Sequence, residues 1–565
     1  MNSFAEVWKV SIRALLCLVL ATHVLWADDN RQIKDWNFQV WMCNNNNLHR
    51  YGVQNFYQML HVGSTPAMNV LLQMDEYGTH SSVRFFIDHN NPVPVQTLSG
   101  TASSYSGTPA NLYEFAAWSM GNYIVGKQCL VLWNHGAGIK DPDIWGRVIG
   151  RFRDEFYVFN KNNGLLELNR KLVHDKKWLE HLQRLSKERG IAFNDTAEVY
   201  LTNQDLKMAL EKIAINLLSG KKIDVLAMDA CHMAMIEVAA QIKNAVQIMV
   251  ASQEVEPGMG YDYAPVLNPR TFGSHISAVD FAKHIVSTYA NQYRHSMSDY
   301  TQSAVDLAHI DPLMEQINIL SGLLTQVLSI GHGGVKVIKD IRFSSELTTQ
   351  FLDNDYIDLY HFFESLQLKS NEFSKLADER GRLWREIGVV VHSAMNVHKA
   401  AVIANAVGVN LPNAHGLSIY FPTRAIHASY YKTVFASCVA NWPAFLAKFL
   451  EGRKLEASTK SIDEHHDGDA CCKECEEGKP CASEATAKHG HAEQDGKPCC
   501  QSCADGKECE DEKPAKNGKK KGKKQKQAKP KPTVKRKGCK SCKQIHKARM
   551  ERKKKESAAR IRPVR

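Results

Sequence analysis

Between residues 35 and 270, short apolar runs alternate with amphipathic stretches, and this alternation limits the fold more than any other feature of the chain. Each run has the length and apolar density of a strand buried on both faces. The predicted strands are Phe38–Met42, Val70–Met74, Val83–Ile87, Cys129–Trp133, Ile223–Met228 and Val246–Ala251. Strands that alternate with helices favour a mainly parallel sheet covered on both faces. The sequence therefore predicts an α/β/α sandwich.

The stretches between these runs carry helix signals. Leu112–Met120 and Leu206–Leu218 both have an amphipathic pattern. The second follows Thr202, a residue type that caps helix N-termini, and Asp205 places an acidic residue in its first turn. A helix beginning directly after Thr202 is therefore expected.

After residue 275 the pattern becomes mostly helical, with one further strand. The predicted elements are helices over Ala278–Tyr293, Pro312–Leu328 and Trp384–Ala406, a strand over Leu417–Phe421 and a last helix over Trp442–Leu450. We therefore divide the folded part into a core over residues 28–300 and a smaller helical C-terminal subdomain over residues 301–455. Residues 142–190 interrupt the core: they are rich in Arg and Lys and carry a helix-like leucine pattern, which indicates an insertion or a processing linker.

The first 27 residues have the layout of a secretory signal peptide. Lys9 and Arg13 supply the positive region, Ala14–Trp26 is apolar, and Ala27 is a suitable last residue before cleavage. The apolar stretch is short for a membrane span, although a non-cleaved anchor is the alternative. We expect an exported protein that is periplasmic, associated with the cell envelope, or extracellular.

From residue 456 the apolar content falls, and we predict a disordered tail over residues 456–565. The pattern CCxxCxxGKxC occurs twice in it, 28 residues apart. The cysteines of the two copies are Cys471, Cys472, Cys475, Cys481, Cys499, Cys500, Cys503 and Cys509. Thiolates with nearby imidazoles suit zinc or copper, whereas an oxidising compartment favours disulfides. Both interpretations stay open, as does a tail without an ordered role.

The net charge of +11 comes from the end of the tail. Residues 511–565 contain 24 Lys and Arg against 4 Asp and Glu, so the remaining residues have a net charge of −9. An anionic partner is therefore expected only for the basic tail, which suits an envelope polymer, a lipid surface or nucleic acid without sequence choice.

Two of the predicted strands end in residues that carry chemistry. Cys129–Trp133 runs into Asn-His135-Gly136-Ala-Gly, and Ile223–Met228 runs into Asp229-Ala-Cys231-His. Ligands of open parallel sheets bind beyond the carboxyl ends of the strands, so neighbouring strands would bring His135 and Cys231 together. A histidine can help a cysteine to form its thiolate, and the N–H groups of Gly136 and Cys231 could face a developing oxyanion. The same pattern alone also fits a core cysteine and a loop histidine.

The residues around these two positions resemble the clostripain family of cysteine peptidases. The blocks that carry the resemblance are Leu132–Gly138, Met228–Val238, Val250–Gly260, Trp36–Asn46, Gly190–Leu201 and His415–Pro422, within a region from about residue 33 to 450. The resemblance implies a caspase-like α/β sandwich and a catalytic dyad of His135 and Cys231. It also implies a monomeric endopeptidase that acts on proteins or peptides. No cofactor is required for the chemistry, and calcium is a possible activator.

The resemblance also implies cleavage after Arg or Lys. Asp229, two residues before the nucleophile, matches the acidic residue that receives the basic side chain; its alternative role is to bond backbone amides. The loop Glu254–Asp262 is expected to form another wall of the pocket for the basic side chain. A second acid in this loop would strengthen the preference for Arg or Lys, but Met259 stands at that position, and Asp262 is the weaker substitute. Family members are often cut internally, and the interruption offers suitable bonds after Arg147, Arg151, Arg153, Lys187 and Arg189.

Two other functions remain as alternatives. One is a catalytically inactive homologue that binds peptides through the same cleft. The other is a metal-binding or surface-adhesive protein that acts through its tail.

Overall fold

The computed structural model describes residues 33–101, 103–140, 157–169, 191–268, 270, 275–330 and 332–466. The predicted signal peptide, the repeat cysteines of the tail and the five possible internal cleavage positions lie outside these residues. Among the described residues, no helix combines the length and the apolar character needed to cross a bilayer.

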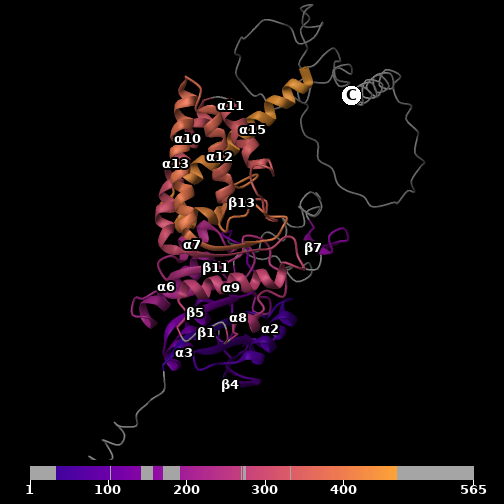
Figure 1. Cartoon of the computed structure of the whole chain (residues 1–565), viewed down its shortest axis with the longest axis vertical. Helices are drawn as coiled ribbons and strands as arrows, with labels where there is room; N and C mark the ends of the chain where they lie inside the picture. Colours follow the sequence, from indigo (N-terminus) through magenta and orange to yellow (C-terminus); the bar gives the residue numbers. More distant parts are fainter. Residues whose placement is uncertain are drawn as a thin grey trace, which may run out of the picture. The chain divides into compact units, whose positions relative to one another are not determined.

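Nine strands of the described residues form one central sheet (Figure 1). In spatial order they are β14 (Val402–Val407), β12 (Thr301–Asp306), β11 (Val246–Ala251), β10 (Ile223–Asp229), β5 (Val125–Trp133), β1 (Lys34–Met42), β2 (Met68–Asp75), β3 (Ser82–Asp88) and β4 (Asn91–Leu98). The five strands from β11 to β2 are parallel to one another, and the strands at both edges are antiparallel. The predicted mainly parallel sheet is therefore confirmed.

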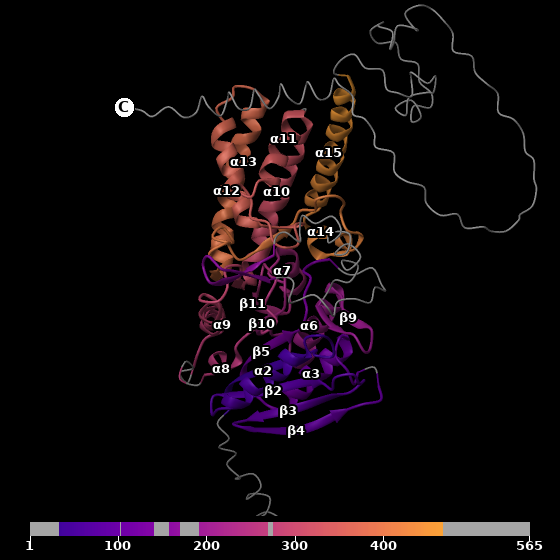
Figure 2. The ribbon, with the colours of Figure 1, turned by 90° about the vertical axis from the view of Figure 1, so that its right-hand side faces the viewer.

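Both faces of the sheet are covered, as the continuous apolar runs indicated. The helices around the sheet are α2 (His49–Val62), α3 (Pro109–Asn122), α6 (Asn203–Leu217), α7 (Ile236–Ile242), α8 (Tyr263–Val266) and α9 (Ala278–Tyr293). Leu130 of β5 packs in one buried cluster with residues of α3 and α6, whereas Val131 packs in another with residues of α2 and α9. Figure 2 shows α8 and α9 on one side of the strands and α6 on the other. Successive side chains of a strand point to opposite faces, so each run supplies two cores.

A helical bundle follows the sheet (Figure 2). Its helices are α10 (Ile310–Ser329), α11 (His332–Phe343), α12 (Leu359–Phe373), α13 (Glu379–Ala401) and α15 (Asn441–His466). Strands β12 and β14 lie beyond residue 300 yet complete the sheet, so the sheet extends across the predicted boundary. The predicted helix Trp384–Ala406 ends at Ala401, because Val402–Val407 pairs with β12 instead. The predicted last helix is also longer, reaching His466.

Smaller elements connect the bundle to the ends of the sheet strands. They are β6 (Tyr157–Asn160), β7 (Leu165–Leu168), β8 (Ile191–Asn194), β9 (Val199–Leu201), β13 (Tyr356–Asp358), β15 (Ser418–Tyr420), α14 (Val434–Cys438) and two 3-10 helices, Leu307–His309 and Ala428–Lys432. Strand β15, predicted as Leu417–Phe421, pairs with β13, and its Ser418 N–H donates to the carbonyl oxygen of Ala234 at 2.9 Å. The bundle thus contacts the segment that follows Cys231.

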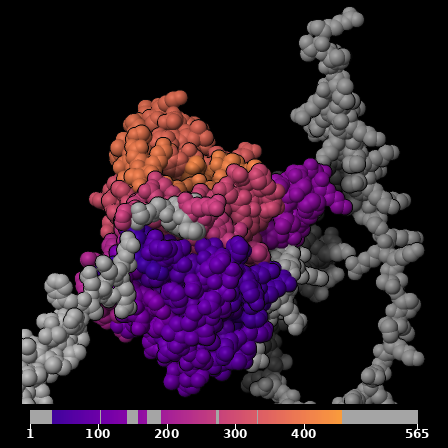
Figure 3. All heavy atoms as spheres, turned by 60° about the horizontal axis from the view of Figure 1, so that its bottom comes forward, coloured from indigo at the N-terminus to yellow at the C-terminus, as the bar shows by residue number. Residues whose placement is uncertain are grey.

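Part of the interruption is a β-hairpin. Strands β6 and β7 pair antiparallel, so the helix-like leucine pattern is wrong for Leu168, which lies in β7. The hairpin projects from the side of the body (Figures 1 and 3), and Phe159 is 60% exposed. In Figure 3 the indigo N-terminal part of the body lies directly against the magenta part.

Candidate active site

Strands β5 and β10 are neighbours, which is the condition under which the two chemical blocks can meet. Asp229 is opposite Trp133 in their parallel register. His135 follows Trp133 by two residues and Cys231 follows Asp229 by two residues, so both lie at the same level beyond the sheet. The condition that the sequence analysis set for the two residues to meet, adjacent strands, is therefore met.

The loops that carry these residues are packed closely against one another. A Cβ atom added at Gly136 would lie 2.4 Å from the carbonyl oxygen of Cys231 and 3.0 Å from the Cβ of Ala230. A real Cβ does not approach a carbonyl oxygen so closely, and glycine is therefore required at this position. The glycine after His135 brings its loop against the backbone of Cys231.

Cys231 is largely buried but is held by a polar contact. Its side chain belongs to a residue only 7% exposed, and the N–H of Glu256 donates to Sγ at 3.3 Å. The carbonyl oxygen of Glu256 lies 3.9 Å from the same sulfur, so the Glu256 backbone fixes the position of Sγ. The next residue, His232, has a φ of +59°, and its Nδ1 lies 3.0 Å from the carbonyl oxygen of Gln253, so its ring contacts the loop after β11.

Three other cysteines lie in the described residues. Burial raises the pKa of the thiols of Cys43 and Cys129 well above the usual range, which keeps them protonated and unreactive. Cys438 is exposed. Cys231 follows β10, beside the loop of His135, and has the N–H of Glu256 at its sulfur.

His135 is fixed by a side chain that was not identified from the sequence. Its Nε2 lies 2.7 Å from Oδ1 of Asn47, and its ring lies edge-on to Phe193 with 6.3 Å between centroids. The carbonyl oxygen of His135 accepts from the N–H of Ala192 at 3.3 Å. The bond is part of an antiparallel bridge in which Gly136 and Ile191 lie opposite each other. The N–H of Gly136 is not a donor in this bridge. The proposed oxyanion role of that amide stays a prediction.

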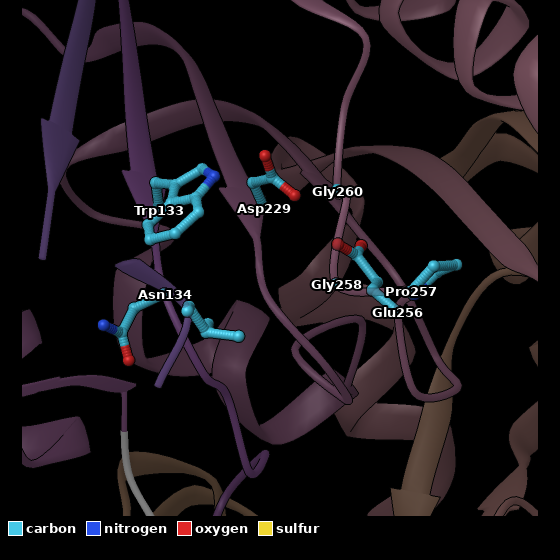
Figure 4. A pocket seen from close by; sticks show the side chains of 8 residues that line it. Trp133, Asn134, Asp229, Glu256, Pro257, Gly258 and Gly260 are labelled. Carbon is cyan, nitrogen blue, oxygen red and sulfur yellow. The ribbon is translucent and has the colours of Figure 1, made fainter. Parts of the chain in front are cut away.

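A pocket opens beside these loops (Figure 4). Its empty volume, which includes space open to solvent, is about 180 Å³. The lining residues are Leu48, Trp133, Asn134, Asp229, Glu256, Pro257, Gly258 and Gly260. In Figure 4 the carboxylates of Asp229 and Glu256 point toward one another. Two acidic side chains thus face one narrow pocket.

Asp229 is held in place by the loop after β11. Its Oδ2 accepts from the hydroxyl of Tyr263 at 2.9 Å and from the N–H of Tyr261 at 3.2 Å. Gly260 has a φ of +56°, and a Cβ there would lie 2.2 Å from Oδ1. Burial together with the neighbouring carboxylates raises the pKa of both tyrosines well above the usual range, so they remain neutral. Asp229 therefore bonds a backbone amide, as its alternative role required, and also lines the pocket.

The second acid of the pocket is Glu256, not Asp262. Asp262 caps α8 by accepting from the N–H of Ala264 at 3.2 Å, and it does not line this pocket. Glu256 is 1% exposed, and its Oε1 accepts from Gln302 Nε2 at 3.2 Å. The loop Glu254–Asp262 was expected to form a wall, but no local pattern in the sequence distinguishes Glu256 from the other acids of this loop.

The β6–β7 hairpin reaches the nucleophile. Leu168 packs in a small buried cluster with Cys231, Val255 and Leu352, and Tyr157 packs against this cluster. The hydroxyl of Tyr157 donates to the carbonyl oxygen of Val255 at 3.1 Å. The predicted interruption therefore supplies a wall of the site on the side of Val255.

Metal ligation finds no support in this part of the chain. Within the described ranges, no group of three or more His, Cys, Asp or Glu side chains is arranged to hold a metal ion. The repeat cysteines lie outside these ranges, so zinc or copper binding and the role of calcium stay predictions.

Comparisons with known proteins identify the family of this chain. The sequence model of the clostripain family matches residues 40–160 and 172–452, more than half of the chain. The comparison with curated proteins gives no match.

Solved structures of the same kind also match. A secreted C11 cysteine protease from Bacteroides thetaiotaomicron, in complex with an irreversible peptide inhibitor, is 16% identical, with a TM-score of 0.45 over 72% of this chain and 99% of that chain. An inactive zymogen C11 protease from Parabacteroides distasonis is 15% identical, with a TM-score of 0.47 and the same coverage. Because the family model spans both the His135 and the Cys231 loops, this chain belongs to the clostripain family of cysteine peptidases.

Proposed function

We propose that this protein is a cysteine endopeptidase that cleaves peptide bonds after Arg or Lys, with Cys231 as nucleophile and His135 as acid and base. The observation that supports this most strongly is the pocket beside Cys231, into which Asp229 and Glu256 direct their carboxylates. Two carboxylates that line one pocket favour an incoming guanidinium or ammonium group over a neutral side chain.

The reaction follows from the two loops. The Cys231 thiolate attacks the carbonyl carbon of the residue in the pocket, and the carbonyl oxygen becomes an oxyanion facing the N–H groups of Gly136 and Cys231. The imidazolium of His135 gives its proton to the leaving amine as the C–N bond breaks, which leaves a thioester on Sγ. Neutral His135 then takes a proton from water, whose oxygen attacks the thioester and releases the carboxylic acid and the thiolate.

Covalent labelling tests this proposal. A peptide chloromethyl ketone with Lys at P1 is expected to alkylate Cys231 as the thiolate displaces chloride, and mass spectrometry of the digested chain locates the adduct. The matched reagent with norleucine at P1 lacks the ammonium group and is expected to react at least about tenfold more slowly. Modification of exposed Cys438 with Cys231 unmodified would contradict the assignment of the nucleophile.

We further propose that the protein is exported through residues 1–27, acts as a monomer, and cuts its own chain in the Arg- and Lys-rich interruption. Two described residues bracket the first part of this segment. Lys140 is held by Asp353 and Asp355, with Nζ–Oδ distances of 3.0 and 2.7 Å, and Tyr157 is bonded to Val255. Both anchors lie in the body of the protein, so a cut between them would leave each new end attached near the site.

Self-processing predicts a difference in chain length. Wild-type protein is expected to appear as two fragments on a denaturing gel, whereas Cys231→Ala is expected to remain at full length, because it lacks the nucleophile. N-terminal sequencing of the second fragment should place the cut after one of the basic residues between 141 and 190. Equal fragmentation of both proteins would show that another protease makes the cut.

The two alternatives predict other results. An inactive peptide-binding homologue would bind substrate peptides without cleaving them and would leave the chloromethyl ketone unreacted. A protein that acts through its tail would bind zinc or copper, or an anionic polymer, independently of Cys231. The polar contact at Cys231 Sγ and the fixed position of His135 favour the peptidase.

A further inference from the structure

We propose that Asn47 is the positioning residue of the Cys231–His135 pair, which makes the site a Cys–His–Asn arrangement. This inference rests on the proposed function, because it assigns a role to a third residue of the same site. The observation behind it is the short contact between His135 Nε2 and Asn47 Oδ1, 2.7 Å apart.

The contact selects one form of the imidazole ring. An amide oxygen can only accept, so Nε2 carries the proton and donates it to Asn47. In the neutral ring the other nitrogen, Nδ1, is then unprotonated, which is the form in which it can act as a base toward a thiol. A histidine with the opposite tautomer would present an N–H where the base is needed. Asn47 therefore fixes both the tautomer and the rotation of the ring.

Asn47 can do this because its loop is anchored on both sides. Asn46 is buried, its Nδ2 donates to the carbonyl oxygen of Phe193 at 2.8 Å, and its Oδ1 accepts from the N–H of Leu48 at 2.8 Å. The ring of Phe193 borders His135 on its other side. Asn46 therefore links the loop of Asn47 to Phe193, and both of these residues contact His135. Leu48, the residue after Asn47, lines the pocket.

The contact with Asn47 also affects which charge state of His135 is favoured. When His135 takes the proton of Cys231, the imidazolium donates a stronger hydrogen bond to Asn47 than the neutral ring does. A bond that is stronger to the charged form favours that form. Asn47 therefore stabilises the thiolate–imidazolium pair over the neutral pair, and its effect is expected at both the histidine and the cysteine.

The test measures ionisation and turnover separately. Alkylation of Cys231 by iodoacetamide is followed against pH by mass spectrometry of the peptide that contains it, in wild type, Asn47→Ala and Asn47→Asp. Asn47→Ala is expected to move the alkylation midpoint upward by roughly one pH unit, and Asn47→Asp to move it downward, since a carboxylate stabilises the imidazolium more than an amide. With a P1 Lys peptide, kcat of Asn47→Ala is expected to fall about 10- to 100-fold with little change in KM.

Asn45→Ala is the matched control, because it loosens the same loop without contacting His135. Asn45 bonds the N–H of Gly78, the carbonyl oxygen of Thr79 and the hydroxyl of Thr196. It should lower the melting temperature and leave the alkylation midpoint unchanged. The inference is overturned if all four proteins share one midpoint, or if Asn45→Ala shifts it as Asn47→Ala does. Because alkylation needs no peptidase activity, absence of hydrolysis in every protein would instead count against the proposed function.

Discussion

Cys231→Ala is expected to abolish hydrolysis of a fluorogenic peptide with Lys at P1. Removal of the nucleophile from a peptidase typically lowers kcat by about 10⁶-fold, because the remaining groups act as a unit with it. Cys231 follows β10, beside the loop of His135, with the Glu256 N–H at its sulfur. The measurement is the initial rate of the purified variant against wild type.

Cys438→Ala is the matched control for that variant. Cys438 is exposed in α14 and takes no part in the site, so the control should keep the wild-type rate. Both proteins should unfold at temperatures close to that of wild type, since each loses only one sulfur atom. If Cys231→Ala retains the rate and Cys438→Ala loses it, the dyad is assigned to the wrong cysteine.

The second large effect concerns the pocket acids. Asp229→Asn is expected to lower kcat/KM for a P1 Lys peptide by about 10²- to 10³-fold, because loss of one partner of a buried charge pair costs about 2–5 kcal/mol. The amide is isosteric, and its oxygen can still accept from the hydroxyl of Tyr263. Glu256→Gln is expected to have a smaller effect, about tenfold, since the neutral amide still contacts Gln302. Each variant should change kcat/KM for a P1 norleucine peptide by less than about threefold.

Asp262→Asn tests whether the second acid of the pocket is Glu256, as the structure indicates, or Asp262, as the sequence suggested. Its carboxylate caps α8 instead of lining the pocket, so its kcat/KM ratio for Lys over norleucine should equal that of wild type. A fall in the ratio for Asp262→Asn, with none for Glu256→Gln, would show that the second acid is Asp262.

The strands and helices that depend on local patterns could be predicted from the sequence. β5 and β10 are continuous apolar runs because parallel strands are buried on both faces. The helix expected after Thr202 is α6, and Thr202 forms a capping box with Asp205. In each case the residues that determine the element are neighbours in the chain.

The elements that were missed depend on distant partners. β12 has the polar sequence TQSAVD, and its residues are buried because β11 and β14 pair with them on either side. Val402–Val407 continues an apolar helical pattern without a breaking residue, so only its pairing with β12 makes it a strand. Tertiary pairing overrides local propensity at both places.

The same distinction applies to the site. His135 and Cys231 closely follow strands that the sequence predicts, so their place at the end of the sheet could be predicted too. Asn47 and Glu256 act through folded contacts with residues 88 and 46 positions away, His135 and Gln302. Four consecutive asparagines look alike in the sequence, and only the folded loop shows that one of them bonds the histidine.

The central claim, a cysteine peptidase with an acidic pocket for the P1 side chain, is tested most directly by one pair of substrates. Wild-type protein is assayed with two fluorogenic peptides that differ only in Lys or norleucine at P1, and kcat/KM is measured for each. We predict a ratio of about 10²- to 10³-fold in favour of Lys, because only its ammonium group can pair with Asp229 and Glu256. Equal rates for the two peptides, or cleavage of neither, would contradict the account.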